Sequence, residues 1–208
     1  MNWLERAHDR HHHGRRLRVL GRHLSELLPK GARALDVGCG DGLLTRFVAD
    51  RRPDLELRGV DSLVRGGTHV PVDGFDGRLL PHPDASFDAV IFVDVLHHAD
   101  DPLGLLREGA RVARRWLVIK DHSADGAFAH ATLRFMDRVS NRRHGIAIPC
   151  HYWRAEEWQR VLAREQLAVE EWRDALALYP WWSRFAFERG LHFAARLRVA
   201  GAAPGPRA

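Results

Sequence analysis

The fold is decided by the stretch Ala34-Leu35-Asp36-Val37-Gly38-Cys39-Gly40-Asp41-Gly42. Its first part is a short, mostly apolar run that is typical of a buried strand, and residues 43–50 have the pattern of a helix. The three glycines therefore lie in a tight turn between a strand and a helix, where positive φ and close backbone approach favour glycine. Free N–H groups at the start of the helix point at this turn, so we expect it to bind a ligand.

The spacing of the glycines narrows the choice of ligand. A dinucleotide fingerprint needs a third glycine three positions after the second, and this chain has Leu43 there. The stretch instead resembles the first motif of the class I S-adenosylmethionine-dependent methyltransferases, in particular their type 11-like domain. That motif reads Asp/Glu-x-Gly-x-Gly-x-Gly and is matched by Asp36, Gly38, Gly40 and Gly42. The resemblance implies that the turn, Cys39 included, passes under the methionine part of S-adenosyl-L-methionine, and that Asp36 holds its ammonium directly or through water.

Composition indicates one soluble domain. The 208 residues suit a single α/β domain, and 45% hydrophobic with 28% charged residues is ordinary for a globular protein. The Arg- and His-rich N-terminus has no secretory core segment and no apolar run reaches the roughly 20 residues of a membrane span, so we expect a cytoplasmic location. The net charge of +5 is scattered among acidic residues, so we expect no nucleic-acid partner.

The N-terminal region predicts a helical lead-in. Residues 3–28 carry apolar positions at helical spacing, and Pro29 and Gly31 end the pattern. We therefore divide the chain into a lead-in at 1–30, a methyltransferase domain at 31–200 and a tail at 201–208 that is disordered by composition. The histidines of the lead-in lack an acidic or cysteine partner, so we predict no metal site; they are His8, His11, His12 and His13. Cys39 and Cys150 are expected to be free thiols.

Two further stretches extend the resemblance along the cofactor. A second strand, 55–60, ends at Asp61, which lies 21 residues after Gly40, where a carboxylate accepts both ribose hydroxyls. Ser62, the next residue, is expected to bind the cofactor beside it. Residues 75–90 resemble the methyltransferase stretch Asp-Ala-x-x-Leu-Pro-Phe-x-Asp-x-Ser-Phe-Asp-x-Val. This resemblance implies that Asp76 caps the adenine amino group and that the Gly77 backbone lies against the ring, although an Asx turn before glycine also explains Asp76.

The remaining strands complete the predicted fold. A fully apolar strand, 87–93, runs into Asp94 and Val95, which by resemblance belong to the cofactor site. The Asn/Asp-Pro-Pro-Tyr/Phe motif of enzymes that methylate nucleobase or glutamine amino groups is absent. Glycines and a proline between 62 and 77 predict a degraded crossover helix and a short strand at 69–73. With strands at 116–120, 167–172 and 192–199, and helices at 103–114 and 154–165, we predict a Rossmann-like, doubly wound, seven-stranded sheet that is mostly parallel with an antiparallel last strand.

An insertion at residues 121–153 is the predicted acceptor side. The shared motifs end at the fifth strand, and the chain then adds an amphipathic helix at 127–139 and a polar loop before the sheet resumes. The alternative is an insertion that only covers the sheet edge. The predicted substrate residues are Asp121, His122, Asn141, His144 and Tyr152. The aromatic stretch 178–187 is open to three interpretations: a substrate wall, a dimer face or buried packing.

The predicted reaction is methyl transfer to a small-molecule acceptor through an oxygen, nitrogen or carbon atom, with S-adenosyl-L-homocysteine as product. The acceptor class includes lipids and secondary metabolites, and we expect a monomer or homodimer. Positioning alone supplies much of the rate, and an oxygen acceptor must lose a proton, for which histidine is the usual agent. The candidate bases are His97, His98, His122, His144 and His151. The alternatives are a nucleotide-cofactor oxidoreductase and a cofactor-binding protein without turnover.

Overall fold

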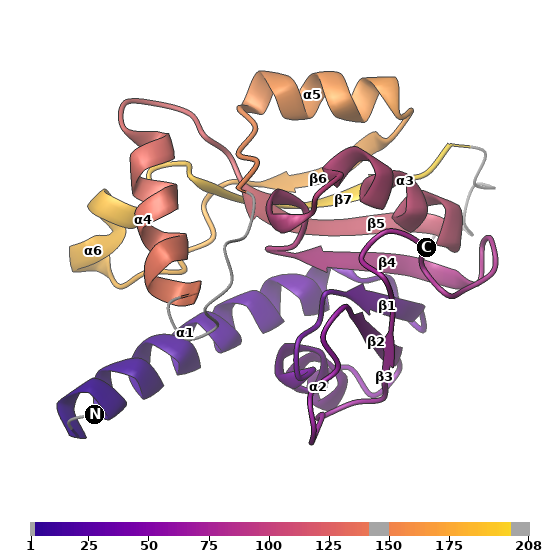
Figure 1. The fold of residues 1–208 in the computed structure, drawn as a ribbon, viewed down its shortest axis with the longest axis horizontal. Helices are drawn as coiled ribbons and strands as arrows, with labels where there is room; N and C mark the ends of the chain where they lie inside the picture. The colour runs from indigo at the N-terminus through magenta and orange to yellow at the C-terminus, as the bar shows by residue number, and fades with distance from the viewer. Residues whose placement is uncertain (1–2, 142–149, 201–208) are drawn as a thin grey trace.

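The protein forms a seven-stranded sheet in a computed structural model that describes residues 3–141 and 150–200 (Figure 1). The strand order is β3-β2-β1-β4-β5-β7-β6, and β7 runs antiparallel to both of its neighbours. The pairs among β1 to β5 are all parallel, as the sequence predicts. The strands are β1 Arg33–Val37, β2 Glu56–Asp61, β3 Val72–Gly74, β4 Phe87–Val93, β5 Ala113–His122, β6 Ala168–Arg173 and β7 His192–Arg198.

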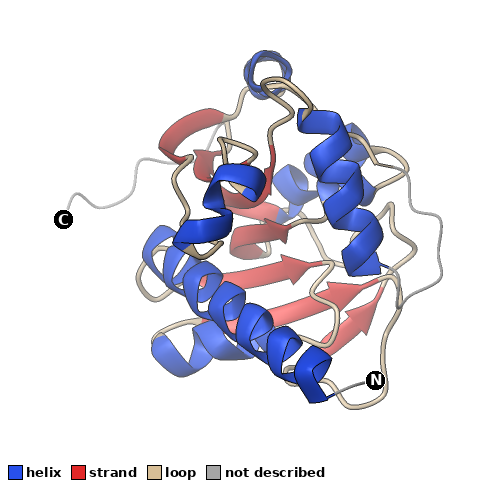
Figure 2. Cartoon of the chain, turned by 90° about the vertical axis from the view of Figure 1, so that its left-hand side faces the viewer, coloured by secondary structure: helices blue, strands red, loops and turns tan. Residues whose placement is uncertain are grey.

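Helices cover both faces of this sheet (Figure 2). On one face lie α1, Trp3–Leu27, and α2, Leu43–Arg51; on the other lie α3, Pro102–Val112, and α5, Ala155–Arg164. Two further helices, α4 at Ala129–Asn141 and α6 at Trp181–Phe187, lie beyond the carboxyl ends of β4 and β5, at the left of Figure 1. A short 3₁₀ turn, η1 at Leu96–His98, follows β4. None of the helices in the described ranges has the length and apolar character to cross a membrane.

The central strands are apolar because both of their faces are buried. In β4, Val90 and Phe92 pack in the cluster beneath α3 and α5, whereas Ala89 and Ile91 pack beneath α1 and α2. Successive side chains of a strand point to opposite faces, so a strand covered on both sides reads as a continuous apolar run. The same alternation extends past the ends of the strands and decides on which face each polar residue of the site lies.

The local predictions hold with small shifts. No helix forms between residues 62 and 71, which confirms the degraded crossover, and the third strand covers Val72–Gly74 rather than 69–73. Asp101 caps α3, because its Oδ1 accepts a hydrogen bond of 2.9 Å from Gly104 N. The helix α6 was not predicted. Residues 142–149, including the candidate His144, lie outside the described residues, as does the side chain of Asn141.

Candidate functional site

The glycine turn is closely packed at its two ends and open in the middle. Gly38, Gly40 and Gly42 have φ of 71°, 63° and 75°, values that favour glycine. A Cβ atom would lie 2.5 Å from Val95 Cγ2 if added at Gly38, and 2.5 Å from Val70 Cγ2 if added at Gly42. A Cβ at Gly40 would meet nothing within 4 Å. The turn therefore rests on the loops after β4 and before β3 and leaves its centre free for close approach of a ligand.

The end of β2 is tied directly to this turn. Asp61 Oδ2 accepts a hydrogen bond of 2.7 Å from Gly40 N, and its Oδ1 accepts one of 2.9 Å from Leu63 N. A carboxylate oxygen accepts more than one hydrogen bond, so both oxygens keep capacity for a ligand. The predicted neighbour Ser62 is exposed beside it. The two expected cofactor contacts therefore meet at one edge of the sheet.

Asp36 lies beneath the turn and is nearly inaccessible, with 4% of its surface exposed. Its Oδ2 accepts a hydrogen bond of 2.6 Å from Thr45 Oγ1 of α2. Burial raises the pKa of Asp36 to about 7, because the charged form loses its hydration. The Cys39 side chain packs over Gly59, where an added Cβ would lie 2.3 Å from Cys39 Sγ, so this residue offers the turn only its backbone.

The predicted adenine segment forms an Asx turn. Asp76 Oδ1 accepts hydrogen bonds from Leu79 N at 2.7 Å and Arg78 N at 2.8 Å, and these two N–H groups lower the pKa of Asp76. The following Gly77 has a φ of 80°, and an added Cβ there would meet nothing within 4 Å. The geometry of the Asx turn is thus present, and it leaves the glycine backbone open beside the exposed carboxylate.

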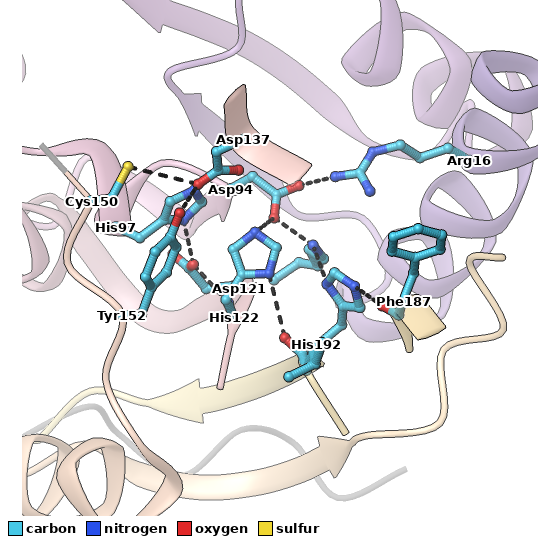
Figure 3. A network of polar contacts seen from close by, with 12 residues as sticks. Arg16, Asp94, His97, Asp121, His122, Asp137, Cys150, Tyr152, Phe187 and His192 are labelled. Carbon is cyan, nitrogen blue, oxygen red and sulfur yellow. Dashed lines mark hydrogen bonds and ion pairs between the residues drawn. The ribbon is translucent and has the colours of Figure 1, made fainter. Parts of the chain in front are cut away.

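A second, polar part of the site lies where β4 and β5 end and β7 begins (Figure 3). On the face toward α1, the fully buried Lys120 forms an ion pair with Asp94, and Arg16 of α1 forms another with the same carboxylate. Burial would raise the pKa of Asp94, but the charges of Lys120 and Arg16 hold it well below its usual value. His192 Nδ1 lies 3.4 Å from Lys120 Nζ, and its Nε2 lies 3.0 Å from Phe187 O. His122 is on the same face, with Nε2 3.6 Å from Asp94 Oδ1.

His97 and Asp121 form a buried pair beside this group. His97 Nδ1 lies 2.6 Å from Asp121 Oδ1, which also accepts a hydrogen bond of 2.7 Å from His122 N. Both side chains are buried, with 3% of His97 and 0% of Asp121 exposed. Burial lowers the pKa of His97, but the Asp121 carboxylate outweighs it and raises that pKa above its usual value. Asp121 thereby fixes the orientation of the His97 ring.

The other nitrogen of His97 faces α4. His97 Nε2 lies 3.7 Å from Asp137 Oδ2, and Tyr152 donates its hydroxyl proton to the same carboxylate. The His98 ring stands beside His97 with centroids 3.9 Å apart. Three buried atoms in this region make no hydrogen bond within the described residues: His97 Nε2, His98 Nδ1 and Asp121 Oδ2. Unpaired polar atoms in a protein interior are costly, so these atoms point to a ligand.

The structure brings together most of the residues predicted for the acceptor side. The candidates that meet in the polar cluster are His97, His98, Asp121, His122 and Tyr152. His151 does not join them, because its side chain is exposed and only its backbone N donates to His97 O, at 2.8 Å. Asp94 stands at the predicted place, but its carboxylate is already paired with Lys120 and Arg16.

Sequence reasoning missed four members of the cluster: Arg16, Lys120, Asp137 and His192. A lysine within an apolar strand was a usable signal for Lys120, since such a lysine needs a buried counter-charge. Asp137 gave no signal, because it lies among polar residues of an amphipathic helix. The prediction of no metal site stays a prediction, but the structure brings possible metal ligands together in two places. Two groups form from residues of separate elements, Asp94 with His97, Asp121 and His122, and His97 with His98 and Asp137.

The aromatic stretch 178–187 divides between surface and core. Trp181 and Phe185 of α6 are 86% and 83% exposed, whereas Leu178 is buried at 3%. A cleft of about 440 Å³ between α4 and α6 is lined in part by Phe135, Phe185 and Phe187. Buried packing therefore explains only the start of the stretch, and a substrate wall or dimer face stays a prediction for the rest.

Together, the sheet order, the glycine turn and the carboxylate at the end of β2 define a class I S-adenosylmethionine-dependent methyltransferase domain, and S-adenosyl-L-methionine is its cofactor. A family model described as a methyltransferase domain matches residues 8–171, and the chain belongs to this family.

Curated relatives share shorter segments. The chain is 35% identical over 97 residues to the ubiquinone biosynthesis O-methyltransferase of Xanthomonas oryzae pv. oryzae (strain PXO99A). This match covers 40% of this chain and 39% of that protein. It is 33% identical over 106 residues to the 27-O-demethylrifamycin SV methyltransferase of Amycolatopsis mediterranei (strain S699). That match covers 44% of this chain and 39% of the relative. The matches thus span about two fifths of the length of these relatives.

Solved structures share the fold at low identity. A chain of the complex between the Haloferax volcanii Trm112 methyltransferase activator and a putative methyltransferase has a TM-score of 0.65 and 19% identity, covering 93% of this chain and 95% of that chain. An S-adenosylmethionine-dependent methyltransferase from Mesorhizobium loti has a TM-score of 0.62 and 16% identity, covering 85% and 96%. The [4+2]-cyclase SpnF has a TM-score of 0.60 and 19% identity, covering 86% and 80%. These likenesses show the fold alone.

Proposed function

We propose that the protein transfers the methyl group of S-adenosyl-L-methionine to a hydroxyl oxygen of a small-molecule acceptor. The observation that carries this proposal is the buried His97–Asp121 pair beside the glycine turn. Val95, which packs against Gly38, stands only two residues before His97, so the pair lies next to the cofactor turn. The curated relatives support an oxygen acceptor, because one is named an O-methyltransferase and the other acts, by its name, on a 27-O-demethyl compound.

We assign the cofactor contacts as the family resemblance implies. The open centre of the turn at Gly40 receives the methionine part, with Asp36 beneath it toward the ammonium. Asp61 and Ser62 receive the ribose, and the Asp61 carboxylate is already held in place by Gly40 N. Asp76 and Gly77 receive the adenine. The open space above Gly40 and Gly77, where an added Cβ would meet no atom within 4 Å, fits a flat ligand in close contact with the backbone.

We propose that Asp94 shapes the loop after β4 and that its carboxylate does not contact the cofactor directly. Its carboxylate is paired with Lys120 and Arg16, and it has a φ of 56°, which is uncommon for a residue with a side chain. We propose that these ion pairs hold the loop after β4 in the shape that presents Val95 to the turn and His97 to the acceptor. Strain of this kind persists where surrounding contacts over-determine it.

The acceptor oxygen is activated at His97. Methyl transfer needs the acceptor oxygen in line with the sulfur–methyl bond, and the hydroxyl proton must leave as the new bond forms. Asp121 holds Nδ1 of the His97 ring and thereby leaves Nε2, a buried atom without a hydrogen-bond partner among the described residues, to face the acceptor side. Lys120, His122 and His192 form the wall of this region on the α1 side.

A His97→Gln variant tests the proposal. Catechol, phenol and aliphatic alcohol acceptors are screened with isotopically labelled S-adenosyl-L-methionine, and S-adenosyl-L-homocysteine binding is measured by calorimetry. We expect methyl transfer to fall by about 100-fold or more, the range of general acid–base effects, with product affinity nearly unchanged. The control is His130→Gln, which alters an exposed histidine of α4. Wild-type turnover in the His97 variant would move the activating group elsewhere.

A second candidate is catalysis or binding without methyl transfer. Family membership removes the oxidoreductase alternative, but the fold is shared with a protein described as a [4+2]-cyclase. The same acceptor screen separates the two candidates, because methyl transfer produces one S-adenosyl-L-homocysteine for each product molecule. An acceptor that is converted without formation of S-adenosyl-L-homocysteine would favour the second candidate.

A further inference from the structure

We propose that His97, His98 and Asp137 bind one divalent transition-metal ion at the acceptor side of the site. His97 Nε2 and Asp137 Oδ2 are 3.7 Å apart, and one ligand atom from each of the three residues lies within 4.8 Å of the others. Two donors at about 2.0 Å from a tetrahedral Zn²⁺ are about 3.3 Å apart, so His97 Nε2 and Asp137 Oδ2 need only a small closure, and the ligand atom of His98 needs a larger shift of up to about 1.5 Å. Two imidazoles with one carboxylate suit first-row divalent ions such as Zn²⁺ and Fe²⁺.

The unpartnered nitrogens are the second observation that points to a cation. His97 Nε2 is buried, faces Asp137, and is too far from it for a hydrogen bond. His98 Nδ1 is also buried without a hydrogen-bond partner in the described part of the chain. One metal ion would coordinate both His97 Nε2 and the facing Asp137 carboxylate. A proton on His97 Nε2 would instead lack an acceptor, because that carboxylate is 3.7 Å away.

The surroundings of these residues match the outer shell of a metal site. Metal-bound histidines usually donate their second ring N–H to a carboxylate, and His97 Nδ1 lies 2.6 Å from Asp121 Oδ1. Metal-bound carboxylates are themselves hydrogen-bonded, and Asp137 accepts the hydroxyl proton of Tyr152. Both supporting contacts are already made.

The overlapping group around Asp94 is a poorer site. Its carboxylate is paired with the buried Lys120 and with Arg16, so two positive charges already occupy the place of a cation. Lys120 Nζ would repel an ion bound there. The group formed with Asp137 has no such ion pair among the described residues, and it lies near two carboxylates, Asp121 and Asp137.

This inference rests on the proposed function and changes one part of it, because a bound ion would occupy His97 Nε2, and the ion rather than the free nitrogen would act on the acceptor hydroxyl. Metal binding is measured without methyl transfer. The probes are Co²⁺ and Zn²⁺, added to chelator-treated protein without a polyhistidine tag. The titration is repeated in a variant with glutamine in place of His8, His11, His12 and His13, so that any uptake of ions by these histidines is measured separately. Co²⁺ binding is followed by visible absorption and Zn²⁺ binding by calorimetry.

We expect one ion per chain, retained in the variant with four N-terminal glutamines. Asp137→Asn and His98→Gln should each weaken binding by at least 10-fold, and His130→Gln should not change it. Binding of S-adenosyl-L-homocysteine shows that each variant is folded. The proposal is overturned if binding is lost with the N-terminal histidines, if Asp137→Asn and His98→Gln bind like the wild type, or if the wild type binds neither ion. Methyl transfer without bound metal would leave the proposed function standing and remove the ion from it.

Discussion

The protonation of Asp36 gives a direct test of the turn. Burial raises its pKa from the ordinary value of 3.8 to about 7. Between these values the folded protein keeps a proton that the unfolded chain has lost, so folding takes up a proton and stability falls as pH rises through this window. At about 1.36 kcal/mol per pH unit, the difference between 3.8 and 7 corresponds to about 4 kcal/mol of lost stability once pH exceeds 7.

An Asp36→Asn variant removes this cost. The amide keeps an oxygen that accepts the hydrogen bond of Thr45 Oγ1 and carries no charge to dehydrate. Urea unfolding of both proteins should therefore give similar stabilities near pH 4, and the variant should be more stable by about 4 kcal/mol at pH 8. Equal stabilities at pH 8, or a less stable variant, would show that ionisation of the buried Asp36 carboxylate does not lower the free energy of unfolding.

Cofactor binding should favour the charged form of Asp36, whereas folding favours its neutral form. If the ammonium of S-adenosyl-L-homocysteine lies near Asp36, binding favours the ionised carboxylate and releases a proton near and below pH 7. Calorimetry in two buffers of different ionisation enthalpy measures this release. We expect it in the wild type, and we expect none from this position in Asp36→Asn together with weaker binding. Identical proton release in the two proteins would remove Asp36 from the cofactor site.

Three further predictions concern the surrounding contacts. Asp61→Ala should weaken S-adenosyl-L-homocysteine binding by about 1.5 to 3 kcal/mol in calorimetry, the cost of losing hydrogen bonds to a charged group, and should also lower the melting temperature because Gly40 N and Leu63 N lose their acceptor; unchanged affinity would refute the ribose assignment. Gly38→Ala should lower the free energy of unfolding by about 1 to 3 kcal/mol in urea, because its positive φ is strained and its Cβ would meet Val95 at 2.5 Å; a neutral result would mean that the turn relaxes. Lys120→Met should destabilise the fold by about 3 to 5 kcal/mol in the same assay, because it leaves the Asp94 carboxylate with one counter-charge fewer; a stability within 1 kcal/mol of the wild type would show that Arg16 suffices.

The sheet and the cofactor turn are readable from sequence because their signals are local. Both faces of β4 are buried, so the strand appears as an unbroken apolar run, and the glycines mark the turn that follows β1. The acceptor side is not local. Asp137 could not be identified as a site residue from the sequence, because its role depends on contact with His97, which lies 40 positions away in the chain.

The apolar side of α4 is only partly buried. The sequence predicts an amphipathic helix with apolar positions that include Phe128, Leu133 and Phe135. In the structure Leu133 is buried, whereas Phe135 is 57% exposed and Phe128, which precedes α4, is 80% exposed. The helix covers only a small cluster at the end of the sheet, with Ala129, Leu133 and Tyr152 among its members. Spacing along a helix shows which residues share a face, but the extent of the partner surface decides how much of that face is buried.

The strand order has a consequence for how the site comes into being. β7 is the last strand to be made, yet it lies between β5 and β6, and it brings His192 opposite His122. Until it arrives, β5 is an open edge and β6 has no neighbour, a state in which unpaired strands attract other chains. The chain can thus fold its cofactor half early, whereas the wall formed by Lys120 and His192 closes only when the final strand is inserted. We expect nascent chains that end before residue 192 to aggregate through the open edge of β5, and completion of β7 to be the step that commits the protein to its native state.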